Sequence, residues 1–155
     1  MLLYRISKAK YAREISGHGV RMAGGRWNLK GTPVIYTSDS TALATLEMLV
    51  HVSLNLMPKN ISMTTFELPD NIGIDKISAA KLPKNWHTYP APGILAEIGS
   101  DWINKCSRVA LSVPSSITPS GEGRNYLINP RHPDFAKIKI INVVPYKFNA
   151  RLLKG

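Results

Sequence analysis

The sequence predicts an α+β fold, with a largely antiparallel or mixed β-sheet and flanking helices. Short segments rich in β-branched and aromatic residues mostly follow one another along the chain instead of alternating with helices. None of these segments runs directly into a G-x-G-x-x-G or Walker loop, so a doubly wound nucleotide-binding fold is disfavoured. We therefore expect about six short strands and two or three helices.

The expected elements follow from local patterns along the chain. Strands are predicted over residues 2–6, 31–38, 61–69, 108–114 and 125–128, and over residues 137–152, which Pro145 should divide into two strands. The segment 15–28 contains many glycines and reads as a loop. A second helix, over residues 93–106, is indicated by apolar residues at helical spacing.

The clearest helix is expected over residues 40–58, capped by Asp39 or Ser40 and ended by Pro58. Its apolar residues fall on one side at a 3.6-residue period: Ala42, Leu43, Leu46, Leu49, Val50 and Leu56. Glu47 lies at the edge of this apolar stripe. It is therefore either a surface glutamate or a carboxylate at the rim of a cleft.

Composition limits the class of protein. A chain of 155 residues, 44% hydrophobic and 19% charged, is expected to form one globular domain, residues 1–155. The single cysteine, Cys106, excludes an internal disulfide and is expected to be a free structural thiol in a reducing compartment. The four histidines lie far apart, so no metal site is predicted. We expect neither a signal peptide nor a membrane span, and hence a cytoplasmic location.

The chain is strongly basic, with a formal net charge of +10. This charge favours anionic partners: nucleic acid, a phosphorylated small molecule or an acidic protein. The basic residues are scattered and form no block of five or six, which is more typical of general partner attraction than of a module that reads DNA sequence.

The stretch "GGRWN", residues 24–28, combines two glycines with a guanidinium, an indole and an amide. Glycine allows close backbone approach, and the planar fork of Arg26 suits phosphate or carboxylate. The alternative is a glycine turn with Arg26 in solvent and Trp27 in the core. Both interpretations stay open on these five residues.

Five stretches occur in the order and approximate spacing of a known family: "GGRWN", "GTPVIYTS", "ALATLEMLVH", "LSVPS" and "NYLINPRHPDF". From Leu3 to Leu152 the chain resembles the RES-domain family, toxins of bacterial toxin–antitoxin systems named for an Arg, a Glu and a Ser. Two departures occur. The link 116–124 is longer than usual, and Gly99-Ser100-Asp101 stands where the family tends to have Gly-Asp before tryptophan.

The resemblance assigns the family's functional positions to Arg26, Glu47 and Ser115, and places Tyr36 and Asn125 in the dinucleotide pocket. It implies an ADP-ribosyltransferase-like fold with NAD as substrate and no metal. It also implies a cognate antitoxin with a helix-turn-helix DNA-binding region that covers the active site, and a toxin homodimer within a larger complex. DNA would then be bound only through the antitoxin.

These residue types suit cleavage of the nicotinamide–ribose bond, which passes through an oxocarbenium-like state. Arg26 can pair with the pyrophosphate, and Tyr36 can stack on nicotinamide. Glu47 can stabilise the cationic ribose, bond a ribose hydroxyl or orient water. Ser115, which has no recognisable nucleophile elbow, is expected to position the dinucleotide.

Several questions stay open at this point. The ADP-ribose acceptor can be water, phosphate or a protein, and the last would make the chain an ADP-ribosyltransferase. His51 lies one helical turn from Glu47 and can line the same cleft. A different class, a basic toxin that binds or cuts RNA, is supported by the charge alone.

Overall fold

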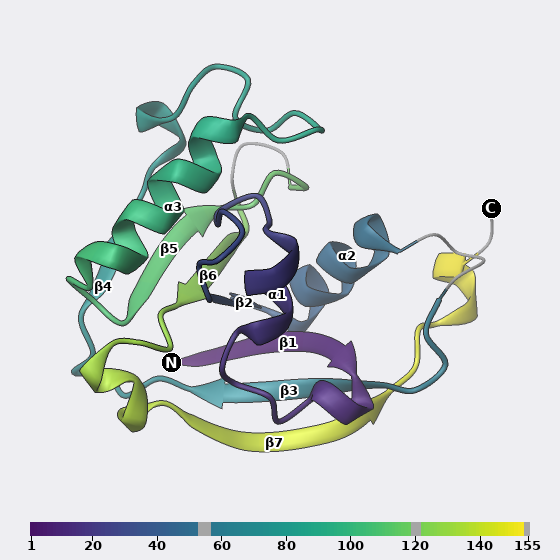
Figure 1. Ribbon diagram of the computed structural model, residues 1–155. Helices are drawn as coiled ribbons and strands as arrows, with labels where there is room; N and C mark the ends of the chain where they lie inside the picture. Colours follow the sequence, from purple (N-terminus) through teal and green to yellow (C-terminus); the bar gives the residue numbers. More distant parts are fainter. Residues whose placement is uncertain (53–56, 119–121, 154–155) are drawn as a thin grey trace.

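The computed structural model describes residues 1–52, 57–118 and 122–153. Seven strands in this part of the chain form one sheet in the order β4-β5-β6-β2-β1-β3-β7 (Figure 1). Their bounds are Leu2–Lys8 (β1), Ile35–Ser38 (β2), Ile61–Glu67 (β3), Ile74–Lys76 (β4), Ala110–Pro114 (β5), Arg124–Ile128 (β6) and Lys139–Tyr146 (β7). Neighbouring strands are antiparallel, except that β4 and β5 run parallel. This mixed sheet confirms the predicted α+β class.

Three α-helices accompany the sheet: α1 (His18–Ala23), α2 (Thr41–His51) and α3 (Gly93–Lys105). In Figure 1, α3 lies along the β5 and β6 side of the sheet, α2 stands on the other side of the view, and α1 crosses in front between them. Short 3-10 turns occur at Ala9–Tyr11, Ala79–Lys81, Pro133–Lys137 and Ala150–Leu153.

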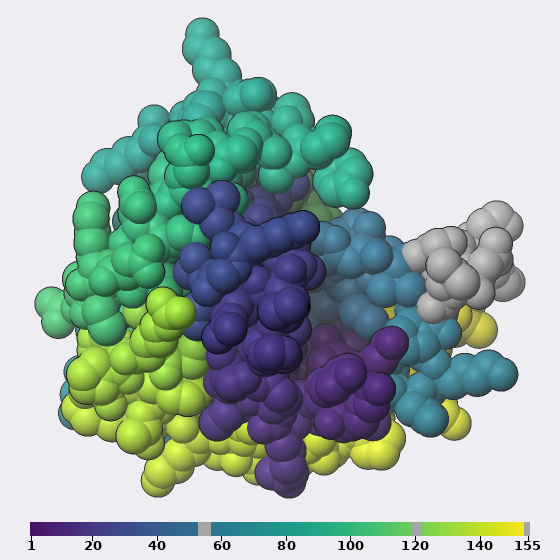
Figure 2. Space-filling model, in the orientation of Figure 1, coloured from purple at the N-terminus to yellow at the C-terminus, as the bar shows by residue number. Residues whose placement is uncertain are grey.

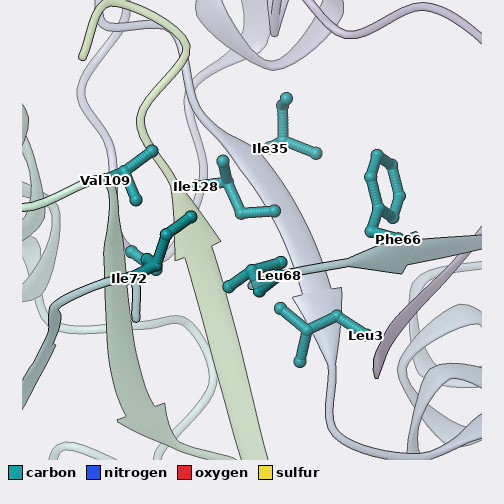
Figure 3. Packing of buried hydrophobic residues seen from close by; sticks show 8 residues of the cluster. Leu3, Ile35, Phe66, Leu68, Ile72, Val109 and Ile128 are labelled. Atoms are coloured by element: carbon teal, nitrogen blue, oxygen red, sulfur yellow. The ribbon is translucent and has the colours of Figure 1, made fainter. Parts of the chain in front are cut away.

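The core occupies both faces of the sheet, because successive residues of a strand point to opposite sides. Ala110 and Ile128 belong to a first cluster, with Leu3, Ile35, Phe66, Leu68, Ile72 and Val109 (Figure 3). Their neighbours Leu111 and Leu127 belong to a second cluster, with Trp27, Val34, Leu95, Trp102, Ile103 and Val113. The second cluster packs α3 onto the sheet, so β5 and β6 are held on both faces.

The helix predicted over residues 40–58 is shorter in the structure. Ser40 caps α2, as predicted, by accepting a hydrogen bond from the amide of Leu43 at 3.1 Å. The helix ends at His51, well before Pro58, so the predicted stop is wrong. The predicted apolar stripe is only partly buried, since Leu46 and Val50 are 39% and 59% exposed. Leu56 lies outside the described residues.

The division of the last segment at Pro145 is also wrong. Pro145 lies inside β7 and pairs with Ser62 of β3. Because β7 is an edge strand, a residue without an N–H is tolerated there as long as that position faces away from the neighbouring strand. The helix α1, within the predicted loop, and the short strand β4 were not predicted.

Candidate active site

Three predicted residues from separate elements meet at one carboxylate. Glu47 lies on α2, Ser115 follows the last residue of β5, and Asn125 lies in β6. The hydroxyl of Ser115 donates a hydrogen bond to Glu47 Oε1 at 3.0 Å, and the amide nitrogen of Asn125 donates to the same oxygen. The antiparallel pairing of β5 with β6 brings these two donors together. Glu47 is therefore fixed by side chains 68 and 78 residues away in sequence.

Each donor is held in turn by its own partner. Ser38, at the end of β2 and paired with Asn125, donates to Asn125 Oδ1 at 2.8 Å, so the amide nitrogen of Asn125 must face Glu47. Ser115 is fully buried, and its hydroxyl accepts from the amide of Ile117 at 3.2 Å. Since a hydroxyl with one such acceptor role still has its proton to give, its donation to Glu47 is favoured.

The second oxygen of Glu47 faces a different environment. The side chain of Glu47 is 23% exposed, and Oε2 lies 3.9 Å from Nε2 of His51, whose own side chain is largely exposed. Within the described residues, both hydrogen bonds to this carboxylate go to Oε1. The carboxylate is thus anchored through Oε1, whereas Oε2 accepts no hydrogen bond from the described residues.

Arg26 lies beside this cluster on the turn of residues 24–28. Its Nη1 donates to the carbonyl of Trp86 at 2.8 Å, and its Nη2 donates to the carbonyl of Thr88 at 3.1 Å. Partial burial lowers the pKa of Arg26, and the charge of Glu47 and the hydroxyl of Tyr36 oppose that shift. The guanidinium of Arg26 and the carboxylate of Glu47 therefore interact electrostatically without forming a direct ion pair.

Tyr36 holds the turn that carries Arg26. Its hydroxyl accepts from the amide of Trp27 and donates to Asn28 Oδ1, both at 2.9 Å. A Cβ on Gly25 would come within 2.9 Å of both the Tyr36 hydroxyl and Asn28 Oδ1, so the glycine makes room for this contact. Burial raises the pKa of Tyr36, so its hydroxyl stays protonated as a donor.

The same turn rests on α3. Trp27 is 2% exposed and belongs to the second core cluster, so its indole packs in the interior, as the core interpretation of "GGRWN" expects. A Cβ on Gly99 of α3 would lie 1.9 Å from the Trp27 carbonyl oxygen. In Figure 2, the dark-blue residues of α1 and the following turn lie between the green residues of α3 and the blue residues of α2.

The structure thus joins Glu47, Ser115 and Asn125 directly and places Arg26 and Tyr36 next to them. Two supporting residues were not singled out from the sequence, although both lie in the quoted motifs: Ser38 ends "VIYTS" and Asn28 ends "GGRWN". The carbonyls of Trp86 and Thr88, which accept from Arg26, could not have been predicted, because any residue has a backbone carbonyl. No group of metal-ligating side chains occurs in the described parts of the chain, and none of the helices described there could cross a membrane.

The fold is similar to a solved structure of a toxin–antitoxin complex. The match is to the MbcT–MbcA complex of M. tuberculosis, with a TM-score of 0.75 over 98% of this chain and 86% of the other, at 17% identity. At this identity the likeness supports the shared fold and nothing finer.

Comparisons of sequence show the family to which the chain belongs. The chain is 35% identical to "Toxin Res" of Photorhabdus laumondii, covering 100% of this chain and 99% of the relative. It is 37% identical to "Toxin Res" of Pseudomonas putida, covering 94% and 97%. It is also 35% identical to the "Prs ADP-ribosylating toxin" of a Sphingobium species, covering 92% and 89%. Residues 2–149 match the RES domain, and the chain therefore belongs to the RES-domain family.

Proposed function

We propose that this chain is the toxin of a toxin–antitoxin system and that it cleaves the nicotinamide–ribose bond of NAD⁺. The observation that carries the proposal is the carboxylate of Glu47, anchored through Oε1 by Ser115 and Asn125 with Arg26 beside it. A fixed negative charge next to a cationic fork matches a dinucleotide whose ribose becomes positive while its pyrophosphate stays negative. The names of the relatives support the toxin role.

In the proposed reaction, the bond between ribose C1′ and the nicotinamide nitrogen breaks, and its electron pair leaves with nicotinamide. The pyridinium becomes a neutral pyridine, and positive charge develops on the ribose. Glu47 stabilises this charge through the oxygen that Ser115 and Asn125 leave open. An acceptor then bonds to C1′ and loses its proton.

Arg26 is proposed to bind the pyrophosphate. Two of its N–H groups donate to the carbonyls of Trp86 and Thr88, which leaves others for phosphate oxygens. Tyr36 is partly buried, and its ring is proposed to flank nicotinamide while its hydroxyl holds the turn. Ser115 and Asn125 act as positioning residues for Glu47.

The first test is loss of NAD⁺ and release of nicotinamide by purified protein freed of its antitoxin. We expect Arg26→Ala and Glu47→Ala to lower kcat/KM at least about hundredfold, the range seen when a charged transition-state partner is removed. Glu97→Ala and Arg13→Ala, which change exposed residues of the same types, are the matched controls. Full activity in both site variants would overturn the site assignment.

A second candidate is transfer of ADP-ribose onto a protein, which the name of the Sphingobium relative favours. The same bond breaks, but a protein side chain replaces water or phosphate as acceptor. Label from NAD⁺ carried on the adenylate phosphate would appear on a macromolecule if transfer occurs. Label found only in soluble products supports hydrolysis or phosphorolysis.

We further propose that a cognate antitoxin with a helix-turn-helix region binds the toxin in the cytoplasm, and that a toxin homodimer forms within the complex. The solved complex with the same fold supports an antitoxin partner. At physiological salt, DNA should then shift in a mobility assay only when the antitoxin is present. A shift by the toxin alone at physiological salt would count against this assignment.

A further inference from the structure

The loop of residues 85–90, here called the Trp86 loop, is tied to the candidate site by its backbone. The carbonyls of Trp86 and Thr88 both accept from the guanidinium of Arg26, at 2.8 and 3.1 Å. The Thr88 hydroxyl donates to the carbonyl of Asn85 at 2.9 Å and so closes the loop on itself. Any shift of the Trp86 loop would therefore also move Arg26.

The loop is also anchored from the inside. The Trp86 side chain packs against the second core cluster, and its amide donates to the carbonyl of Pro83 at 2.9 Å. The rings of Trp86 and His87 meet edge to face, with centroids 5.8 Å apart. One aromatic residue of the loop thus points inward and fixes it.

Tyr89 is the outward-facing aromatic residue of the same loop. It is 88% exposed, the largest value among the exposed hydrophobic residues of the described chain, and it directly follows Thr88. Its ring takes part in no aromatic or cation–π pair within the described residues. A flat ring on a fixed loop, one residue from a carbonyl that binds Arg26, is placed to receive a planar ligand.

We propose that Tyr89 stacks on the adenine ring of the dinucleotide and determines specificity for the adenylate half. This inference rests on the proposed function, in which Glu47 acts at the nicotinamide ribose and Arg26 binds the pyrophosphate. The Trp86 loop bonds to Arg26 through two of its carbonyls, and Tyr89 directly follows one of them in sequence, so Tyr89 belongs to the loop that holds the proposed pyrophosphate clamp. In the dinucleotide, adenine is joined through a ribose to the pyrophosphate and is the planar group on the side away from the cleaved bond.

The experiment measures the Kd of two stable probes by titration calorimetry, so that no turnover is needed. ADP-ribose carries adenine and the pyrophosphate, whereas nicotinamide mononucleotide carries neither adenine nor a pyrophosphate. We expect Tyr89→Ala to weaken ADP-ribose binding about tenfold, the usual order for loss of one base-stacking contact, and to leave the mononucleotide unchanged. Tyr89→Phe should bind like the wild type because stacking needs the ring and not the hydroxyl.

Tyr11→Ala is the matched control, since it removes another exposed tyrosine that lies beyond the end of β1. It should change neither Kd. With active protein, Tyr89→Ala should raise KM for NAD⁺ with little change in kcat, as expected for a group that binds equally in the ground and transition states.

Three results would overturn the inference. ADP-ribose binding within twofold of the wild type in Tyr89→Ala would remove the stacking role. An equal loss for both probes would assign Tyr89 to the ribose phosphate that the two probes share, and not to adenine. Wild-type protein that binds neither probe and leaves NAD⁺ intact would overturn the proposed function itself, and the inference with it.

Discussion

Glu47 is held at Oε1 by two hydrogen-bond donors, Ser115 and Asn125. Loss of either donor should lower kcat more than it changes KM. Replacing Asn125 by aspartate keeps the shape but puts a second carboxylate where an N–H donor now meets Glu47. We expect Asn125→Asp to lower kcat about hundredfold with a smaller change in KM, because the altered group positions the carboxylate. The measurement is initial rates of nicotinamide release.

Asn104→Asp is the control for this substitution, since Asn104 is exposed on α3. It should behave as wild type. An Asn125→Asp protein with wild-type kcat and a normal thermal unfolding curve would show that Asn125 does not position Glu47.

Tyr36 contributes to stability through its hydroxyl. Tyr36→Phe leaves the amide of Trp27 and the side-chain oxygen of Asn28 without this partner, and we expect the free energy of unfolding to fall by about 1–3 kcal/mol. Urea unfolding at neutral pH measures this difference. Tyr11→Phe, at an exposed position, is the control and should unfold like the wild type.

The contribution of Tyr36 to the free energy of unfolding should also depend on pH, and it should fall as the pH rises. Burial raises the pKa of Tyr36 above its unfolded value of about 10. Its contribution is therefore complete below pH about 10 and decreases as the pH rises towards the folded pKa. The stability advantage of wild type over Tyr36→Phe should shrink above pH 10. An advantage that stays constant up to pH 12 would contradict the burial of the hydroxyl.

The sequence allowed the residues of the candidate site to be named, but not their contacts. Glu47, Ser115 and Asn125 were assigned because their motifs occur in a recognisable order. The bonds of Arg26 to the carbonyls of Trp86 and Thr88 were not predictable, because backbone carbonyls carry no residue-specific signal and the partners are 60 and 62 residues apart.

At the level of elements, the site depends on how closely α3 approaches the turn of residues 24–28. Gly99→Ala would place a Cβ 1.9 Å from the Trp27 carbonyl, so the helix or the turn must move. We expect a loss of stability of at least about 2 kcal/mol, at the upper range for overpacking because the obstacle is backbone. Thermal unfolding measures the loss.

Gly93→Ala, in the first turn of the same helix, is the matched control. A Cβ there meets nothing within 4 Å, and alanine is the better helix former. It should leave stability unchanged or slightly raised. If both variants unfolded at the wild-type temperature, close packing at Gly99 would be excluded.

Most elements were predictable, the short strands β2, β5 and β6 included, but α1, β4 and the end of α2 were not. The α3 prediction over residues 93–106 agrees with Gly93–Lys105, because its apolar residues repeat over more than three turns. The six-residue α1 and three-residue β4 are too short to establish a period. Pro145 misled the prediction of β7 because its tolerance depends on the strand lying at the sheet edge, which a sequence does not reveal.

For the whole molecule, the net charge of +10 predicts weak, non-specific attraction to nucleic acid. Three lysines, Lys8, Lys10 and Lys59, line one surface cavity of about 510 Å³, whose lining does not include Glu47. We expect binding to duplex DNA or RNA at 50 mM salt and its loss by 200 mM, because counterion release dominates such contacts. Fluorescence anisotropy against salt measures this. RNA binding that persists at high salt would favour the RNA-toxin alternative.

The distribution of Glu47, Ser115 and Asn125 along the chain has a consequence for synthesis. Helix α2 can form from local contacts as soon as it is made, but its carboxylate acquires both donors only after residue 125 has been added. Contacts of such sequence separation form late, since they require ordering of the intervening chain. A nascent chain therefore carries the carboxylate long before it has the assembled cluster, and under the proposed function it becomes harmful only when its translation is nearly finished.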